Sequence, residues 1–453
     1  MRYHPVVLML VVWGLCIAAF TILPFQLENR VMSLYGFFIL SLFIAVFCAG
    51  ALAAALPQAQ KPRRRDVTVD FRLADRALMA AGVIAILASL IDTSGRNVLD
   101  LADAYQIRSE RAGNLMAGDE RGGSIWFQLA FLTYPASYIY LVREIGFRAR
   151  PVLWKVVVFG LMPVTMASLA MGGRAPLFYA LLMLIYGFAL RKHTFPKGKQ
   201  GAPGVGPQAV VRPRRKPLLP FRLTAPVKVA IGVLGAVMMI YFVQVFLTRA
   251  DVAGGVDAMF GVAHQSWGVN FNGPGSNMIF ALLGPDGAYL LFVFVWYAVQ
   301  GLVMSNTIFT SYDGPMLLGV GGIDLVSALM RRVNGQFVAD GYAHLADLNV
   351  YGFLPSAFGS LYVDFKFFGL IVCGGWGWLA GLVYGKVKRG VDPLWLLAVP
   401  CVTLGIVFST INTPIGFSNG LVTHSWLVVV MILARTIVLR PGPAAPAAQP
   451  GRR

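Results

Sequence analysis

The stretch SLYGFFILSLFIAVFCAGALAAAL, at residues 33–56, runs for twenty-four residues without one charged side chain. About 20 apolar residues in a helix span the ~30 Å hydrocarbon core of a bilayer. Inside a bilayer the backbone must satisfy its own hydrogen bonds, so a block of this kind has to be helical. A transmembrane β-barrel would instead show alternating segments of about ten residues. The stretch therefore predicts a transmembrane helix.

Similar apolar blocks recur along the whole chain. They lie near residues 5–23, 33–56, 77–91, 125–142, 152–171, 175–190, 227–247, 367–385, 393–411 and 418–434. Of all 453 residues, 57% are hydrophobic and 13% are charged, whereas soluble domains carry roughly 25% charged residues. The sequence predicts an all-α, polytopic integral membrane protein of about 10–12 transmembrane helices.

The basic residues gather in a few of the connecting segments. These segments are loops 57–76, 143–151 and 191–226, residues 386–390 and the tail from Arg435. Cytoplasmic loops of membrane proteins are enriched in Lys and Arg, and counting the blocks puts all five segments on one side. Both termini are therefore predicted to be cytoplasmic. Loop 92–124, residues 172–174 and most of 248–365 then lie outside.

Four segments follow from this topology. They are an N-terminal bundle of six spans at 1–190 with the outer loop 92–124, a basic cytoplasmic linker at 191–226, a C-terminal bundle at 227–438 with the long outer segment 248–365, and a disordered cytoplasmic tail at 439–453. A long structured loop is usually functional, so we expect the active site within 248–365.

Block 287–304 has two interpretations. It is apolar enough to span, but one additional span would break the charge parity of the loops. Either it lies in the membrane interface or re-enters, which we favour, or it pairs with a second span near 350–363.

Several kinds of chemistry lack a signal in the sequence. No nucleotide-binding motif occurs, and GVGG at 319–322 is expected to be a turn or a helix-packing site. The five histidines are scattered, and no carboxylate pair follows a metal-ligand spacing. The four cysteines lie in apolar blocks and are expected to be small core residues. The net charge of +18 sits in loops on one side, so we expect no cofactor, no metal and no nucleic acid.

Arginines on the predicted outer side are the strongest candidates for chemistry. Arg174 lies in MGGRAPL between two spans, and Arg249 lies in FLTRAD at the end of the seventh block. A guanidinium group binds phosphate in a two-pronged geometry, so a lipid-linked pyrophosphate would fit these positions. The structural alternatives are a carboxylate or helix end for Arg174, and Asp251 for Arg249.

The long outer segment carries further candidates. Arg331 and Arg332 end an amphipathic piece at 314–330 and could either bind substrate or anchor to lipid headgroups. His344, in GYAHLADLN, could accept a proton from a sugar hydroxyl, or it could be an incidental loop histidine.

Loop 92–124 and the outer aromatic residues complete the set. Tyr105, Arg108, Glu110 and Arg111 form a polar cluster suited to sugar or phosphate, which a solvated loop helix would explain equally well. Interfacial belts explain most aromatic residues of such proteins, and sugar stacking is the alternative here. These residues are Trp267, Phe271, Tyr289, Trp296, Tyr297, Tyr312, Tyr342, Tyr351 and Tyr362.

The run NVYGFLPSAFGSLYVDFKFFGL, at 349–370, resembles a segment of bacterial O-antigen-type polymerases. In that family an N-x-[YT] start leads to Y-x-D-F-G-x-x-G before a late span. The matching residues are Asn349, Tyr351, Tyr362, Asp364, Phe365 and Gly369, while Lys366 replaces the usual small residue. GGR at 172–174 is similar to the G-S-R or G-x-R motif of these oligosaccharide repeat-unit polymerases. A long outer segment before the last three spans agrees too.

The resemblance implies a membrane glycosyltransferase of GT-C-like architecture in the bacterial inner membrane. Such enzymes transfer an undecaprenyl-pyrophosphate-linked glycan, at the outer leaflet, to the non-reducing sugar of an incoming lipid-linked repeat unit. They use no nucleotide sugar and no metal. The implied partners are the donor and acceptor glycans, membrane lipids and a chain-length regulator.

The resemblance also suggests roles for the candidates. Arg174 and Arg249 would hold the donor pyrophosphate, and His344 would handle the proton of the acceptor hydroxyl. The substrate contacts would come from Arg331, Arg332, Tyr105, Arg108, Arg111 and Tyr351. Asp364 would be structural and would bond a helix end or an arginine.

Two other functions compete with this one. An O-antigen ligase shares the general architecture but transfers finished glycan to the lipid A core. A secondary transporter or lipid-linked flippase usually shows internal repeats and ionisable residues near mid-membrane. The sequence shows neither a clear repeat nor an acidic residue in the middle of a firm span.

Overall fold

The computed structural model describes most of the chain as helices. It describes residues 4–28, 32–55, 67–94, 124–170, 173, 175–194, 225–350, 354–389 and 393–438. Within this part, six helices are long and apolar enough to cross a membrane, or seven if one bent pair counts as a single span. The prediction of a helical, polytopic membrane protein is therefore confirmed.

The ten predicted blocks all coincide with helices, but four of these helices are short. The short apolar helices are Pro5–Thr21, Ala175–Arg191, Trp395–Thr410 and Gly420–Leu433. The structure thus supports six or seven candidate spans, and the expected number of ten or more remains a prediction.

The first half of the chain contains eight of the helices that the structure describes. They are α1 (Pro5–Thr21), α2 (Leu34–Ala55), α3 (Arg72–Asp92), α5 (Ile125–Thr133), α6 (Ala136–Phe147), α7 (Leu153–Lys155), α8 (Met162–Ala170) and α9 (Ala175–Thr194). A π-helical turn at Val156–Leu161 joins α7 to α8. Side chains cap some of the helix N-termini. At α5, the Ser124 side chain accepts a hydrogen bond from the Phe127 N–H, a backbone donor that has no partner within the helix.

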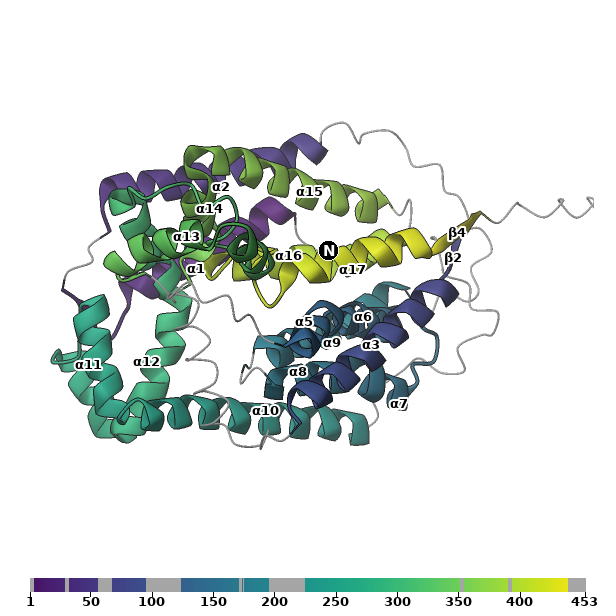
Figure 1. The fold of residues 1–453 in the computed structure, drawn as a ribbon, viewed down its shortest axis with the longest axis horizontal. Helices are drawn as coiled ribbons and strands as arrows, with labels where there is room; N and C mark the ends of the chain where they lie inside the picture. The colour runs from purple at the N-terminus through teal and green to yellow at the C-terminus, as the bar shows by residue number, and fades with distance from the viewer. Residues whose placement is uncertain are drawn as a thin grey trace, which may run out of the picture.

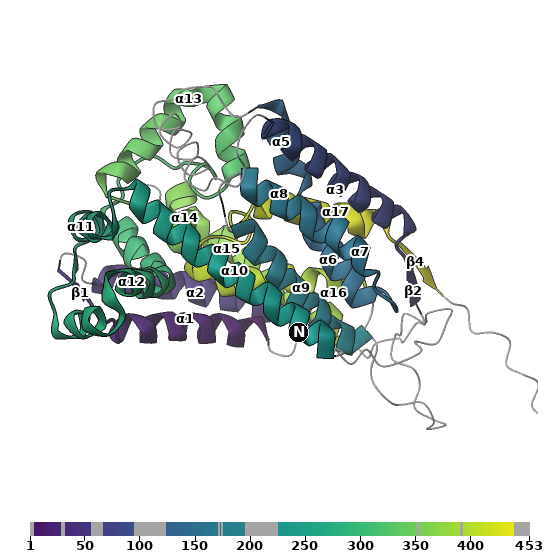
Figure 2. The same cartoon turned by 90° about the horizontal axis from the view of Figure 1, so that it is seen from below.

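The second half holds the longest helices. They are α10 (Ala225–Val252), α11 (Val256–Trp267), α12 (Pro274–Ser311), α13 (Asp324–Asp347), α14 (Ser356–Phe365), α15 (Gly369–Arg389), α16 (Trp395–Val407) and α17 (Gly420–Leu433). Four short strands form two antiparallel pairs, β1 (Gln26–Leu27) with β3 (Val269–Asn270) and β2 (Val67–Asp70) with β4 (Arg435–Val438). Figures 1 and 2 show that the strands only tie helix ends together.

Helices α2 and α15 pack against each other along a seam of glycines. A Cβ on Gly377 would lie 2.9 Å from the carbonyl carbon of Phe47, and one on Gly381 would lie 2.9 Å from that of Ala51. Only glycine allows backbones to approach so closely, as at many helix contacts in membranes. Both members of each pair advance by four residues, so the two helices run parallel.

Segments predicted to lie on one side of the membrane do gather at one end of the bundle. Strand β2, from loop 57–76, pairs with β4 at the start of the tail. At the same end, the His4 ring packs edge-on against Tyr384, with ring centroids 4.8 Å apart. We call this the basic end. The compartment it faces rests on the charge rule.

The opposite end, which we call the far end, contains the connection between α1 and α2. Helix α12 is broken at Gly284, where φ is +68°. The arm before the break and the arm after it both contact this connection: the Ser276 hydroxyl donates to the Pro24 carbonyl at 3.0 Å, and the Ser33 N–H donates to Asn306 Oδ1 at 3.0 Å. Figure 1 shows α12 at a steep angle to α2 and α15. Length and composition would let α12 cross a membrane, but these contacts favour the interpretation that block 287–304 lies in the interface or re-enters.

Candidate functional site

The structure describes four of the predicted site residues, namely Arg249, Arg331, Arg332 and His344. The other five lie outside the described residues; they are Arg174, Tyr105, Arg108, Arg111 and Tyr351. The four described residues belong to α10 and α13.

Helix α13 is a hairpin that brings three of the predicted residues onto one element. Its helical geometry breaks at Asn334, with φ −153° and ψ 80°. The two arms meet where the Ser327 and Tyr342 hydroxyls lie 2.7 Å apart. Arg331 and Arg332 therefore lie near the tip, whereas His344 lies near the base. The Arg332 and His344 side chains are exposed, and Arg331 is half-buried.

A buried carboxylate fixes the turn that leads into this hairpin. Asp364 is 2% exposed and accepts a hydrogen bond from the Gly321 N–H at 2.8 Å. The backbone N–H groups of Gly319 and Gly322 also bond to it. Gly319 has a φ of +97°, which glycine tolerates best. The GVGG run is therefore a turn, as predicted, and Asp364 is structural, but it binds this turn instead of a helix end or an arginine.

Lys366, which replaces the small residue of the polymerase-like motif at 349–370, contacts the start of the same turn segment. Its Nζ donates to the Tyr312 carbonyl at 2.9 Å and lies 3.8 Å from the centroid of the Tyr312 ring. Burial, followed by the charges of Asp364 and Asp313, raises the pKa of Tyr312. The Tyr312 hydroxyl thus stays protonated and donates to the Pro315 carbonyl at 2.7 Å. Asp364 and Lys366 together clamp residues 312–322.

A second loop, residues 411–419 between α16 and α17, meets this turn. A Cβ on Gly416 would overlap the carbonyl oxygen of Gly322, so the two backbones touch there. The Ser360 hydroxyl, on α14, lies 3.5 Å from Asn412 Oδ1. Six non-glycine residues in the described part of the chain have positive φ. Leu318, Ser418 and Asn419 lie in these two loops, and Asn349, Ser356 and Lys366 lie at the ends of α13 and α14. Backbone strain of this kind concentrates at functional sites.

Helices α5, α6 and α9 also reach the place where residues 312–322 meet loop 411–419, which we call the junction. The Tyr138 hydroxyl lies 3.1 Å from Ser418 Oγ and donates to the Pro176 carbonyl at 3.3 Å. Asn419 Nδ2 donates to the Phe131 carbonyl. Pro176 follows Arg174 by two residues in the sequence. The part of the chain that follows the predicted GGR motif thus packs at the junction.

The tip of the α13 hairpin reaches α5 as well. Arg332 Nη2 donates to Gln128 Oε1 at 2.9 Å. The hairpin therefore connects the first half of the chain to the second at its tip. Arg249 lies elsewhere, half-buried in the last turn of α10, where Gly254 and Gly255 turn the chain into α11.

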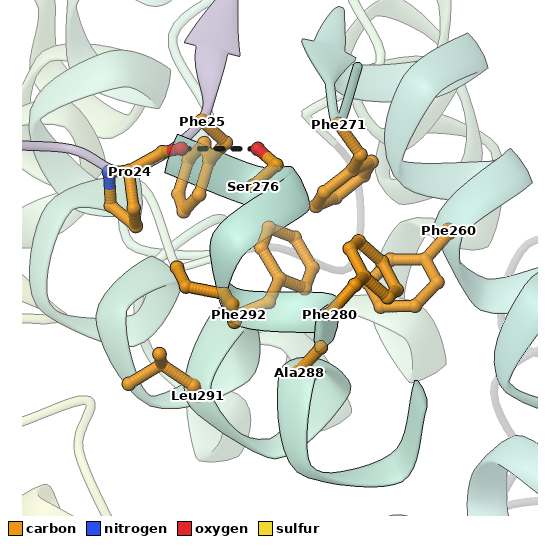
Figure 3. A pocket seen from close by; sticks show the side chains of 10 residues that line it. Pro24, Phe25, Phe260, Phe271, Ser276, Phe280, Ala288, Leu291 and Phe292 are labelled. Carbon is orange, nitrogen blue, oxygen red and sulfur yellow. Dashed lines mark hydrogen bonds between the residues drawn. The ribbon is translucent and has the colours of Figure 1, made fainter. Parts of the chain in front are cut away.

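A small crevice at the far end is unsuited to a charged substrate (Figure 3). Its walls are almost entirely apolar and are made by Pro24, Phe25, Phe260, Phe271, Ser276, Ile279, Phe280, Ala288, Leu291 and Phe292. The polar member, Ser276, already donates its hydroxyl hydrogen to Pro24. Burying a charge there would cost free energy without compensation.

The outer aromatic residues mostly pack inside the protein. Trp267, Tyr289, Trp296, Tyr312 and Tyr362 are all buried, and the Trp267 and Trp296 rings stack 5.1 Å apart. For these five, both the interfacial-belt and the sugar-stacking interpretations were wrong, because neighbouring helices cover the rings. Cys16, Cys373 and Cys401 are buried free thiols, as predicted.

Sequence reasoning missed the residues that the two loops bring together. Asp324, Asn412, Ser418 and Asn419 lie in short polar stretches next to strong apolar blocks. The stretch INTPIGFSNG, at 411–420, was the available signal, since its Asn, Pro and Gly are typical of turns. Within the part of the chain that the structure describes, no three His, Cys, Asp or Glu side chains lie close enough to hold a metal ion.

No family model, no curated protein and no solved structure matches this chain.

Proposed function

We propose that this protein polymerises lipid-linked oligosaccharide repeat units by glycosyl transfer at the outer leaflet of the bacterial inner membrane, with both termini in the cytoplasm. The observation that carries the proposal is the α13 hairpin at the far end of the bundle. It presents Arg331, Arg332 and His344, and the residues that clamp its base, Asp364 and Lys366, belong to the polymerase-like run.

The proposed glycosyl transfer requires positive charge next to the departing pyrophosphate. Guanidinium groups stabilise the charge that develops on the leaving phosphate oxygens. Arg331 and Arg332 supply such groups near the tip, and Arg174 supplies a third by its place in the sequence beside Pro176. His344 is exposed near the base and is a candidate for proton handling. Arg249 could hold the donor from α10.

The test is to replace the arginines singly and to follow polymer length on a gel of surface polysaccharide. Arg174→Ala and Arg331→Ala should each shorten the chains strongly while the protein level stays normal. Arg72→Ala is a matched control, because the Arg72 side chain is 84% exposed at the basic end. Unchanged chain lengths in both Arg174→Ala and Arg331→Ala would rule the proposal out.

The same gel distinguishes the proposed polymerase from an O-antigen ligase. Loss of a polymerase leaves single repeat units attached to the core, whereas loss of a ligase leaves the core with none.

One buried carboxylate bears on the transporter alternative. Glu144 is fully buried near the end of the candidate span Ile125–Phe147, not in its middle. Its carboxylate oxygens each lie 2.9 Å from Arg148 Nη1, and Oε1 also accepts from the Val152 N–H. A carboxylate so fully bonded to fixed groups serves structure better than ion transport, which keeps the polymerase as the favoured function. Gradient-driven uptake into vesicles would reverse that order.

A further inference from the structure

The contact between Gly322 and Gly416 has a consequence for the residues that follow each glycine. Asp324 comes two residues after Gly322, and Ser418 and Asn419 come two and three residues after Gly416. Because the two backbones touch at the glycines, these residues extend from a common point. The crossing thus brings together polar side chains that lie almost a hundred positions apart.

The far side of this contact is buried against α5 and α6. The Tyr138 hydroxyl lies 3.1 Å from Ser418 Oγ, and Asn419 Nδ2 donates to the Phe131 carbonyl. Tyr134 is 2% exposed and Asn419 is 6% exposed, whereas the Asp324 side chain is exposed. The carboxylate therefore lies at the mouth of a buried polar junction.

The position of Asp324 is firmly held. It is the first residue of α13, directly after the turn that Asp364 fixes. The Tyr342 hydroxyl, on the second arm, bonds to both Ser327 and the Val320 carbonyl and so closes the base of the hairpin. A carboxylate on such a base can present its oxygens in one orientation, which general-base catalysis needs.

We infer that Asp324 is the catalytic base of the glycosyl transfer and that it accepts the proton of the acceptor sugar hydroxyl. This inference rests on the proposed function. Carboxylates perform the same task in inverting glycoside hydrolases, where they activate the attacking oxygen. His344 lies on the same hairpin base and is the competing candidate.

The acceptor oxygen forms a bond to the anomeric carbon of the donor, and its proton passes to an oxygen of Asp324. The bond from the anomeric carbon to the pyrophosphate oxygen breaks, and the electron pair leaves with the lipid pyrophosphate. Because the Asp324 side chain is exposed, the proton can then pass to water.

A simpler role for Asp324 is electrostatic. An acidic residue in the first turn of a helix stabilises that helix through the helix dipole. The thermal unfolding midpoint separates the two roles, because loss of the dipole interaction lowers the midpoint of Asp324→Ser, whereas loss of the base lowers the transfer rate at an unchanged midpoint. The control is Asp340→Asn, since Asp340 is an exposed carboxylate on the second arm that only binds Gln336, at 2.7 Å.

The experiment uses the full-length protein in lipid vesicles, with lipid-linked repeat units isolated from a strain that lacks it. Asp324→Asn and Asp324→Ser should each lower the transfer rate by about 100-fold or more, in line with the usual contribution of a general base. Binding of the lipid-linked donor and the thermal unfolding midpoint should stay at the wild-type values. Asp340→Asn should retain the wild-type rate, and His344→Gln should lose less than Asp324→Asn.

Transfer by Asp324→Ser at the wild-type rate would overturn the inference, as would a greater loss in His344→Gln. Both results leave the proposed function intact, provided that the wild-type protein polymerises the units. If the wild-type protein itself makes no polymer, the proposed function fails and the base assignment fails with it.

Discussion

A single methyl group on α15 should reveal whether its glycine seam with α2 holds the two helices together. Gly377 and Gly375 lie one turn or less apart, yet their surroundings differ. A Cβ on Gly377 would lie 2.9 Å from the Phe47 carbonyl carbon, whereas a Cβ on Gly375 would have no neighbour within 4 Å. Gly377→Ala and Gly375→Ala are therefore a matched pair.

The expected difference follows from those distances. The obstructing atoms belong to the α2 backbone, so the helices must move apart to admit the methyl group, and overpacking of this kind costs about 1–3 kcal/mol. Replacing glycine by alanine within a helix gains roughly 0.5–1 kcal/mol at either position. That gain cancels between the two variants. Gly377→Ala should therefore be less stable than Gly375→Ala by about 1–3 kcal/mol.

The native cysteines provide the assay. Cys16, Cys373 and Cys401 are buried, and Cys373 lies on α15 itself with its Sγ 3.3 Å from the Phe43 carbonyl. A fluorogenic thiol reagent should react with them only as the protein unfolds on heating. Cys48 is half-buried, so a Cys48→Ala background removes its early signal. Equal unfolding midpoints for the two variants, or a higher midpoint for Gly377→Ala, would refute close packing along this seam.

Two further substitutions test the clamped turn and the buried ion cluster. Asp364→Asn replaces a carboxyl oxygen that accepts backbone N–H groups with an NH2 group that cannot accept and should cost about 1–3 kcal/mol. Amide hydrogen exchange in residues 317–330 should speed up, while the exposed control Asp347→Asn leaves it unchanged. Glu144→Gln removes the charge that Arg143 and Arg148 share and should cost about 1–3 kcal/mol, because Arg143 keeps its ion pair with Asp75 at 2.6 Å and the Arg148 side chain is 36% exposed. The thiol assay measures this loss, and a wild-type midpoint would contradict the pairing.

The helices were predictable because their signal is compositional. A block such as 33–56 has no alternative to a helix in a bilayer, and each predicted block became one. Composition does not say whether an apolar helix crosses the membrane or lies along its surface. The apolar composition of α12 is compatible with crossing or with lying flat, and its contacts with Pro24 and Ser33 favour the second interpretation. Those contacts join residues about 250 positions apart, which no local pattern encodes.

The candidate site was predictable only in part. The motif at 349–370 pointed to Asp364 as a structural residue, and the doublet Arg331–Arg332 stood out by its charge. Asp324 and Asn419 carried no comparable signal, because their importance comes from a backbone contact between two loops. A lone acidic residue and a lone amide in a turn are common in any sequence.

The placement of α12 has a practical consequence for mapping this protein in cells. Hydropathy counting would give α12 a crossing of its own and would reverse the assigned sidedness of α15, α16 and α17. Lys386, Lys388 and Arg389 would then lie on the non-cytoplasmic side, against the charge rule. Paired fusions of alkaline phosphatase, placed just before Pro274 and just after Ser311, should instead report the same compartment, and an epitope on the C-terminal tail should be reachable only after the membrane is permeabilised.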